Sequence, residues 1–374
     1  MTNTIEKIKK ISMEQTFKIS FLLIAFIFLG CGENKNKANT NNGNQTVDDY
    51  SAKIDSLIQT TSPRKFNGVI SITQNGKRVF SKTYGYSNFE KKTPVSLNDN
   101  FRIQSNSKQI TGVIVLKEVE KGNIELDRPI STYLPEFKAT WVDSVTVHQL
   151  VNMSAGIESL DKPLLFKPGT DFHYSNPAYG LLGRIIKNVT GKEYTEVANS
   201  LFKELGMKNT FCYHFDKENQ ELINGYQGTG SEYEFVKFSE IGFTKDTWND
   251  FIPTGGIISN IRDLHIWDKK LHNGELLEPA SYEIMTNSEI PDVFPALSDE
   301  EMSYGYGIDI ADQPFRYLGH GGSGFGFVNI KFYVPENGLN VIVLENVYHD
   351  DIPIRYHFEK EIRKIVLNSN LTEK

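Results

Sequence analysis

The stretch FRIQSNSKQIT, from Phe101 to Thr111, places a serine three residues before a lysine at the start of an apolar helical pattern. Residues i and i+3 of a helix lie on one face, so the side chains of Ser105 and Lys108 are expected to be neighbours. A serine hydroxyl needs a base before it can act as a nucleophile, and a lysine in apolar surroundings holds its proton weakly. The N-terminus of the helix would add positive potential for an oxyanion. The stretch therefore predicts a nucleophile at Ser105 and its base at Lys108.

The Ser-x-x-Lys spacing is weak support by itself, because it occurs four times in the chain. The other three copies are Ser62…Lys65, Ser159…Lys162 and Ser200…Lys203. The first precedes a strand pattern, the second runs into a proline, and the third lies inside an amphipathic helix. The copy at Ser105 opens a long, largely apolar helix, predicted over residues 104–120. These surroundings single it out from the other three.

A tyrosine motif, Tyr174-Ser175-Asn176, follows a Pro-Gly-Thr turn at residues 168–170. In the functional interpretation, the Tyr174 hydroxyl relays a proton and the Asn176 side chain contacts the substrate. In the structural alternative, Asn176 only caps the helix predicted over residues 176–188. The sequence leaves both interpretations open.

A glycine-rich segment, GHGGSG at residues 319–324, comes just before a strand pattern over residues 325–334. Glycines let a backbone approach a ligand closely, which makes His320, Gly322 and Ser323 candidates for substrate contacts. The structural alternative is a turn leading into the strand, with a histidine at the surface. A lipase-type His-Gly-Gly loop is excluded, because the sequence contains no Gly-x-Ser-x-Gly elbow.

Strand patterns occur at both ends of the chain, with helical patterns between them. The predicted strands cover residues 66–85, with a hairpin turn at Asn75-Gly76, and residues 316–318, 325–334 and 339–346. The predicted helices include residues 47–59, 262–272 and 353–367, and the middle of the chain consists of helices and loops. We therefore expect an α/β (α+β) fold, in which the terminal strands form one antiparallel sheet flanked by helices, with a central helical lobe beside it.

The N-terminus carries a pattern typical of an export signal. Lysines precede an apolar run from Ile19 to Leu29, which reaches only about half-way across a hydrocarbon core. Residues 1–30 are therefore predicted to be a signal peptide, with translation starting at Met1 or Met13. Cys31 follows a small residue and resembles the lipobox cysteine of bacterial lipoproteins, which is lipidated. The alternative is an uncleaved signal anchor with an incidental cysteine.

Residues 31–46 are rich in asparagine and almost free of apolar side chains. This composition predicts a disordered tether between a lipidated Cys31 and a globular domain at residues 47–370. We therefore expect an exported bacterial lipoprotein, anchored in a membrane and facing the periplasm or the cell surface. The second cysteine, Cys212, is expected to be a small buried apolar residue rather than a nucleophile.

The composition disfavours two classes of function. The net charge is −7 and the sequence pI is about 5.7, so the acidic surface repels phosphate backbones and nucleic-acid binding is not expected. The sequence contains neither a His-Glu-x-x-His motif nor a cluster of cysteines and histidines, so no metal or other cofactor is expected. It gives no indication of the oligomeric state.

The order of the three motifs resembles the serine beta-lactamase-related family of class C type. This family includes beta-lactamases, DD-peptidases, D-aminopeptidases and esterases. The likeness extends over residues 48–367, and its most similar stretches are residues 101–111, 122–137, 168–176, 205–207 and 255–264. The resemblance implies a beta-lactamase/transpeptidase-like fold.

The resemblance also implies roles for the motif residues. Ser105 would be the acylated nucleophile and Lys108 its base. Tyr174 would pass the proton to the leaving group and help to activate the water that removes the acyl group.

Four residues would form the substrate site. His320 would replace the lysine of the family's Lys-Thr-Gly triplet, of which Gly322 would be the glycine. Asn176 would contact the substrate. The backbone N–H groups of Ser105 and Ser323 would form the oxyanion hole.

Two departures from the family pattern matter. Met153 stands where the family usually has a histidine, in the segment from Leu150 to Ile157. His320 does not supply a permanent positive charge as a lysine does, which lowers the expected preference for carboxylate-bearing beta-lactams. The loops Tyr213–Pro253 and Thr286–Tyr304, rich in aromatic residues, are predicted to line the cleft.

The leading hypothesis is a serine hydrolase that forms an acyl-enzyme at Ser105 with an ester or a D-amino-acid peptide or amide. It would resemble an esterase or DD-peptidase, with weak beta-lactamase activity at most. The alternative is a non-hydrolysing, penicillin-recognising receptor or binding lipoprotein of the same fold. The expected partners are a small ester, peptide or cell-wall-derived substrate and, through Cys31, a membrane.

Overall fold

The computed structural model describes residues 49–217, 220–228, 232–288, 290–292 and 301–372. The predicted signal peptide, Cys31 and the tether lie outside these residues and stay predictions, as does the domain boundary at residue 47. Among the described residues, no helix is both long and apolar enough to cross a membrane.

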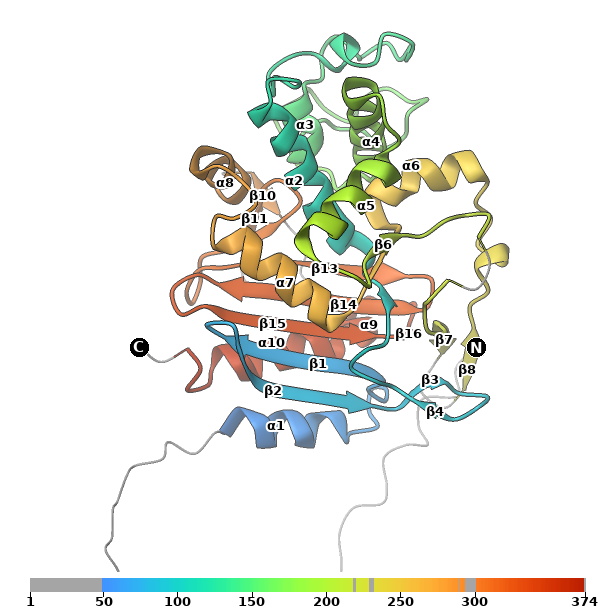
Figure 1. Cartoon of the computed structure of the whole chain (residues 1–374), viewed down its shortest axis with the longest axis vertical. Coiled ribbons are helices and arrows are strands. Elements are labelled where there is room, and N and C mark those ends of the chain that lie inside the picture. Colours follow the sequence, from blue (N-terminus) through green and yellow to red (C-terminus); the bar gives the residue numbers. More distant parts are fainter. Residues whose placement is uncertain (1–48, 218–219, 229–231, 289, 293–300, 373–374) are drawn as a thin grey trace, which may run out of the picture. The chain divides into compact units, whose positions relative to one another are not determined.

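Strands from both ends of the chain form one antiparallel sheet in the order β10-β11-β12-β13-β14-β15-β1-β2 (Figure 1). In chain order these strands are β1 Gly68–Gln74, β2 Lys77–Tyr84, β10 Pro291–Asp292, β11 Met302–Tyr304, β12 Asp309–Ala311, β13 Tyr317–Gly324, β14 Phe327–Val334 and β15 Leu339–Glu345. The N-terminal strand β1 pairs with the C-terminal strand β15 along its whole length, from Gly68 opposite Glu345 to Gln74 opposite Leu339. The prediction of one sheet built from both termini is confirmed.

The hairpin between β1 and β2 turns at the predicted position. Asn75 and Gly76 have φ angles of 50° and 74°. Two consecutive positive φ angles are the geometry of a type I′ turn, which Asn-Gly favours because neither residue is strongly strained there. The local sequence therefore fixes this hairpin.

Helices cover both faces of the sheet. One face packs on α1 (Asp49–Ile58) and α10 (His357–Leu367), through a cluster that includes Ile54, Val343 and Phe358. The other face packs on the region that includes α2 (Ser107–Glu120) and α7 (Ile261–His272). Consecutive residues of β15 belong to opposite clusters, Val343 to the first and Ile342 to the second, as the two-residue period of a strand requires.

The central segment forms the predicted helical lobe, seen above the sheet in Figure 1. Its helices are α3 Val147–Val151, α4 Asn176–Thr190, α5 Tyr194–Leu205, α6 Lys245–Gly255 and α8 Pro279–Thr286. Short strands tie it together: β5 Phe101–Arg102, β9 Ile257–Ser259 and β6 Phe211–Cys212 form one small sheet, and β16 Val347–Tyr348, β7 Tyr226–Gly228 and β8 Tyr233–Phe235 form another. The remaining elements are β3 Tyr86–Asn88, β4 Thr93–Pro94, α9 Ile352–Arg355 and the 3-10 turns η1 Gln104–Asn106, η2 Ile130–Thr132 and η3 Phe238–Glu240.

A buried polar network anchors α2 to the sheet and to α7. The side-chain oxygen of Gln109 accepts hydrogen bonds from Lys331 Nζ at 2.6 Å and from Trp267 Nε1 at 2.8 Å. Lys331 also forms a buried ion pair with Asp268. Because buried polar groups are costly unless they are paired, this network fixes the position of the helix that carries Lys108.

Three predicted elements differ in detail from the structure. The helix predicted over residues 104–120 begins as the 3-10 turn η1, because Gln104 has a φ of 48°. The glycine-rich segment is not a turn before a strand but part of β13, since β12 and β14 pair with it from both sides. The C-terminal helix is interrupted at Tyr356, between α9 and α10.

Candidate active site

Ser105 and Lys108 lie side by side, as their spacing predicts. Ser105 is the middle residue of η1, and Lys108 lies in the first turn of α2. Lys108 Nζ is 3.1 Å from Ser105 Oγ and 3.0 Å from the carbonyl oxygen of Thr254, at the end of α6. The lysine side chain is completely buried.

Burial changes the acid–base state of Lys108. Loss of hydration lowers the pKa of its amine well below the usual value of 10.5, and the nearby carboxylate of Asp309 opposes this shift only in part. An amine with a lowered pKa is neutral in a larger share of molecules, and only the neutral form accepts a proton. The environment therefore favours a base at this position.

Tyr174 adjoins both Ser105 and Lys108 and is half-buried. Lys108 Nζ is 4.7 Å from the centre of the Tyr174 ring. Burial raises the pKa of the Tyr174 hydroxyl well above its usual value, although a hydrogen bond with Ser105 acts in the opposite direction. The phenol is therefore a neutral group, able to donate a proton next to Ser105 Oγ.

Asn176 reaches the same site but does not cap its helix. The N-cap of α4 is Ser175, whose hydroxyl accepts from the backbone N–H of Ala178 at 3.1 Å. Asn176 is exposed, and its side-chain oxygen accepts from Thr254 Oγ1 at 3.3 Å. The capping interpretation of Asn176 is therefore wrong, since its neighbour fills that position.

His320 is buried inside the sheet rather than at the surface. Its Nδ1 is 2.5 Å from the carbonyl oxygen of Gly321 and its Nε2 is 3.0 Å from the hydroxyl of Tyr304. A carbonyl only accepts, so Nδ1 carries the proton and Nε2 accepts from the tyrosine. Burial, with a contribution from Lys108, lowers the pKa of His320 to about 3. His320 is therefore a neutral, buried group, and its ring centre lies 6.3 Å from that of Tyr174.

Gly322 allows β13 to lie directly against the nucleophile turn. A Cβ at this position would be 2.7 Å from the carbonyl oxygen of Ile103 and 2.9 Å from Gln104 Cβ, which is closer than van der Waals contact permits. The turn is also held by Asn106, which donates to Asn329 on β14, while Asn329 donates to the carbonyl of Arg102 at 3.2 Å. These contacts bring the segments around Ser105 and Ser323 together.

Arg355, the last residue of α9, was not predicted from the sequence and contacts Ser323 near the end of β13. Its guanidinium is 3.4 Å from Ser323 Oγ and donates to the carbonyls of His349 and Asp350, each at 2.7 Å. A permanent cation therefore lies beside the predicted substrate site, although His320 supplies none. Thr254 was also not predicted, since it belongs to no motif, whereas Tyr304 was predicted only as the last residue of a loop that lines the cleft.

The aromatic residues of the loop 213–253 divide into core and surface groups. Tyr226 and Trp248 are fully buried, and Trp248 packs against Arg102 together with Tyr213 and Phe238. Phe235 is 42% exposed and borders a hollow of about 480 Å³ that extends from Gly324 and Phe325. Part of the other predicted loop, residues 293–300, lies outside the described residues.

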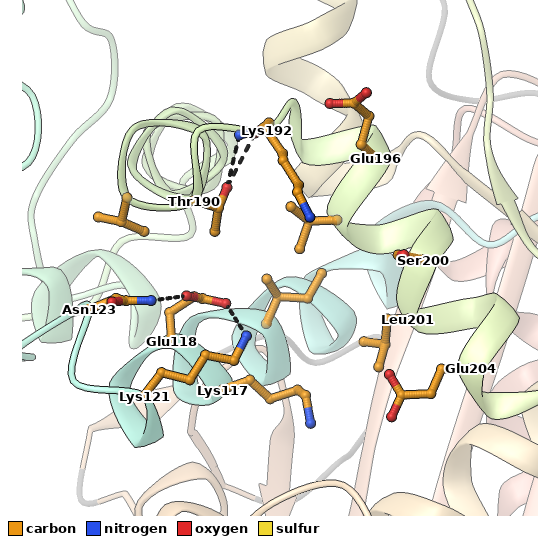
Figure 2. A pocket seen from close by; sticks show the side chains of 13 residues that line it. Lys117, Glu118, Lys121, Asn123, Thr190, Lys192, Glu196, Ser200, Leu201 and Glu204 are labelled. Carbon is orange, nitrogen blue, oxygen red and sulfur yellow. Dashed lines mark hydrogen bonds and ion pairs between the residues drawn. The ribbon is translucent and has the colours of Figure 1, made fainter.

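A separate groove of about 370 Å³ lies between α2, the end of α4, and α5 (Figure 2). Ser200, from one of the other Ser-x-x-Lys copies, borders it. Inside the groove Glu118 accepts hydrogen bonds from Lys121 and Asn123, each at 2.7 Å, so its charge is compensated locally. The groove does not include Ser105, Tyr174 or β13.

Cys212 is free and buried, as predicted, and burial raises the pKa of its thiol.

Comparison with known proteins identifies the family of the chain. The sequence model of the family described as Beta-lactamase matches residues 54–362. The chain belongs to the beta-lactamase family. The resemblance seen in the three motifs and the expected fold class are both confirmed.

Three proteins that are similar to this chain in sequence or in structure carry names of different kinds. The chain is 25% identical to Protein flp of Staphylococcus aureus over 335 residues, which cover 82% of this chain but only 65% of that protein. A penicillin-binding protein homologue from Pyrococcus abyssi has a similar structure, with a TM-score of 0.72, 25% identity and coverage of 86% of this chain and 78% of the other. A D-amino acid amidase from Ochrobactrum anthropi SV3 also has a TM-score of 0.72, with 22% identity and coverage of 86% and 99%, which shows a shared fold.

Proposed function

We propose that this member of the beta-lactamase family is a serine hydrolase that forms an acyl-enzyme at Ser105. One observation carries the proposal: a buried lysine amine lies 3.1 Å from the serine hydroxyl, and a tyrosine hydroxyl adjoins the same oxygen. A nucleophile in contact with both a base and a proton donor has the parts that acyl transfer needs.

The proposed reaction has two stages. In the first, neutral Lys108 takes the proton of Ser105 Oγ, which attacks the substrate carbonyl, and the backbone N–H groups of Ser105 and Ser323 hold the oxyanion. Tyr174 donates a proton to the leaving group as the carbon–heteroatom bond breaks, and takes up the proton held by Lys108, so that both groups regain their starting states. In the second, water loses a proton to Lys108 and attacks the acyl carbonyl. The bond from the acyl carbon to Ser105 Oγ then breaks, Oγ regains a proton from Lys108 through Tyr174, and the carboxylic acid leaves.

We propose an ester or a D-amino-acid peptide or amide as the substrate class. The fold is shared with a D-amino acid amidase, and the neutral, buried His320 offers no charge to a carboxylate. Arg355 instead favours substrates that bear a carboxylate, because its positively charged guanidinium lies beside Ser323. A panel of nitrophenyl esters, D-amino-acid amides, D-Ala-D-Ala peptides and nitrocefin separates these classes, and we expect nitrocefin to be the slowest.

Labelling with a fluorophosphonate probe tests the nucleophile. Wild type should be labelled, and Ser105→Ala should not. Ser200→Ala is the matched control, because it removes the serine of another Ser-x-x-Lys copy on α5 and should leave labelling intact. Equal labelling of wild type and Ser105→Ala would contradict the proposal. Stable acylation by penicillin without turnover of any ester or amide would instead favour the non-hydrolysing receptor.

We also propose that the chain is an exported lipoprotein, anchored through Cys31 and facing the periplasm or the cell surface. The proposal depends on the basic N-terminus, the short apolar run and the cysteine that follows it. Metabolic labelling with a fatty-acid analogue should mark the wild-type chain and not Cys31→Ala. Labelling of both would exclude Cys31 as the lipidated residue.

A further inference from the structure

A single hydrogen bond joins Gln104 to Gly324, and each of these residues is the chain neighbour of one proposed oxyanion donor. Its side-chain Nε2 donates to the carbonyl oxygen of Gly324 at 2.6 Å, and the two residues are 220 positions apart in the sequence. Gln104 immediately precedes Ser105, and Gly324 immediately follows Ser323. This hydrogen bond therefore connects the neighbours of the two backbone N–H groups that would hold the oxyanion.

The backbone at both ends of this bond is unusual. Gln104 has a φ of 48°, a left-handed conformation that a residue with a side chain rarely adopts. Gly324 has a φ of 142°, and the two residues after it, Phe325 and Gly326, have φ angles of 51° and 84°. Non-glycine residues stay in such conformations when surrounding contacts hold them, and they are frequent at functional sites.

The carboxamide of Gln104 is buried and also lies beside the end of α6. The residue is only 2% exposed. A Cβ on Gly255, at the end of α6, would lie 3.5 Å from Gln104 Oε1 and 2.6 Å from the ring of Phe251. The side chain thus lies between α6 and the end of β13, where it has little freedom to take another rotamer.

We propose that Gln104 is a positioning residue that sets the distance between the Ser105 and Ser323 N–H groups. It does not touch the reacting atoms; it acts through the Gly324 carbonyl, which fixes the end of β13 against η1. Because hydrogen bonds to an oxyanion depend steeply on geometry, loosening this end should slow acylation more than it weakens the fold. The inference depends on the proposed acyl transfer at Ser105.

Two substitutions separate the side-chain bond from the backbone conformation. Gln104→Gly keeps the left-handed φ without strain but removes the amide donor. We expect the rate of fluorophosphonate labelling and of p-nitrophenyl acetate hydrolysis to fall about 10- to 100-fold, with little change in melting temperature. Gln104→Glu keeps the size, but an ionised carboxylate repels the Gly324 carbonyl, whereas a protonated one donates to it. Its rate relative to wild type should therefore rise as the pH is lowered.

Gln74→Ala is the control, because Gln74 also donates from Nε2 to a backbone carbonyl, that of Leu371 at 3.0 Å, on the sheet away from the nucleophile. It should keep wild-type rates. Wild-type rates in Gln104→Gly would overturn the inference and leave the proposed function standing. A rate loss matched by a fall in melting temperature, without recovery of Gln104→Glu in acid, would assign Gln104 a purely structural role. A wild-type chain that the probe does not label would overturn the proposed function itself.

Discussion

At the scale of single residues, the proposed acyl transfer depends on the protonation state of Lys108. Its amine is buried next to Ser105, with Asp309 as the opposing charge, and the pKa lies well below 10.5. Only the neutral amine accepts the serine proton, so the acylation rate should rise with pH as Lys108 loses its proton. Since the pKa is lowered, this rise should be complete at a lower pH than an ordinary lysine would require. Labelling rates measured across the pH range test this directly.

The substitution Lys108→Ala should lower the acylation rate by about a thousandfold and abolish this rise, because it removes the amine that lies 3.1 Å from Ser105 Oγ. Lys117→Ala is the control on the same helix, where Lys117 Nζ contacts the carbonyl of Leu276 at 3.3 Å. It should behave as wild type. Near-wild-type rates in folded Lys108→Ala would exclude Lys108 as the base.

At the scale of elements, the site depends on how closely β13 approaches the turn η1. A methyl group at Gly322 would meet the carbonyl of Ile103 at 2.7 Å and Asn329 Oδ1 at 2.8 Å. We expect Gly322→Ala to push the strand away from the nucleophile, to cost about 1–3 kcal/mol of stability, and to lower activity about 100-fold. Chemical denaturation and ester hydrolysis measure the two effects separately.

Gly76→Ala is the matched control, because Gly76 lies in the hairpin turn between β1 and β2 and is not one of the proposed site residues. Its Cβ would meet nothing within 4 Å, but its φ of 74° is unfavourable for alanine. It should cost about 1 kcal/mol and leave hydrolysis unchanged. If Gly322→Ala showed the same pattern as Gly76→Ala, close packing of β13 on η1 would not matter for activity.

At the scale of the whole molecule, a buried charge cluster joins the two ends of the domain. Arg64 donates to both oxygens of Glu345 at 2.7 and 2.6 Å, and to the carbonyls of Ile354 and Arg355 at 2.9 and 2.6 Å. Glu359, on α10, lies 3.5 Å from the same guanidinium. Arg64 therefore makes two short hydrogen bonds to the carboxylate of Glu345, whereas Glu359 lies farther from the same guanidinium.

Burial and the neighbouring Glu345 raise the pKa of Glu359 well above its usual value, with Arg64 opposing the shift. The folded protein therefore prefers protonated Glu359. Its contribution to stability is complete below the pKa of the unfolded chain and is lost as the pH rises through the higher folded pKa. The charge-neutral variant Glu359→Gln should melt close to wild type in acid and several degrees higher in alkaline buffer. Parallel melting curves across pH would show that Glu359 does not titrate in this way.

The sequence alone determined the features that depend on local periodicity. The i, i+3 spacing of Ser105 and Lys108, the Asn75-Gly76 hairpin and the strands at both termini were predicted, because helix and strand periods are expressed over a few residues. The order of the motifs also indicated the family correctly.

Only the tertiary structure decided which distant groups surround these residues. The Thr254 carbonyl that contacts Lys108 is 146 positions away, and the Gln104–Gly324 bond spans 220 positions. The neutral state of His320 and the start of the nucleophile helix as a 3-10 turn likewise follow from burial and packing. Such contacts have no local period, so they arise only when the sheet brings both ends of the chain together.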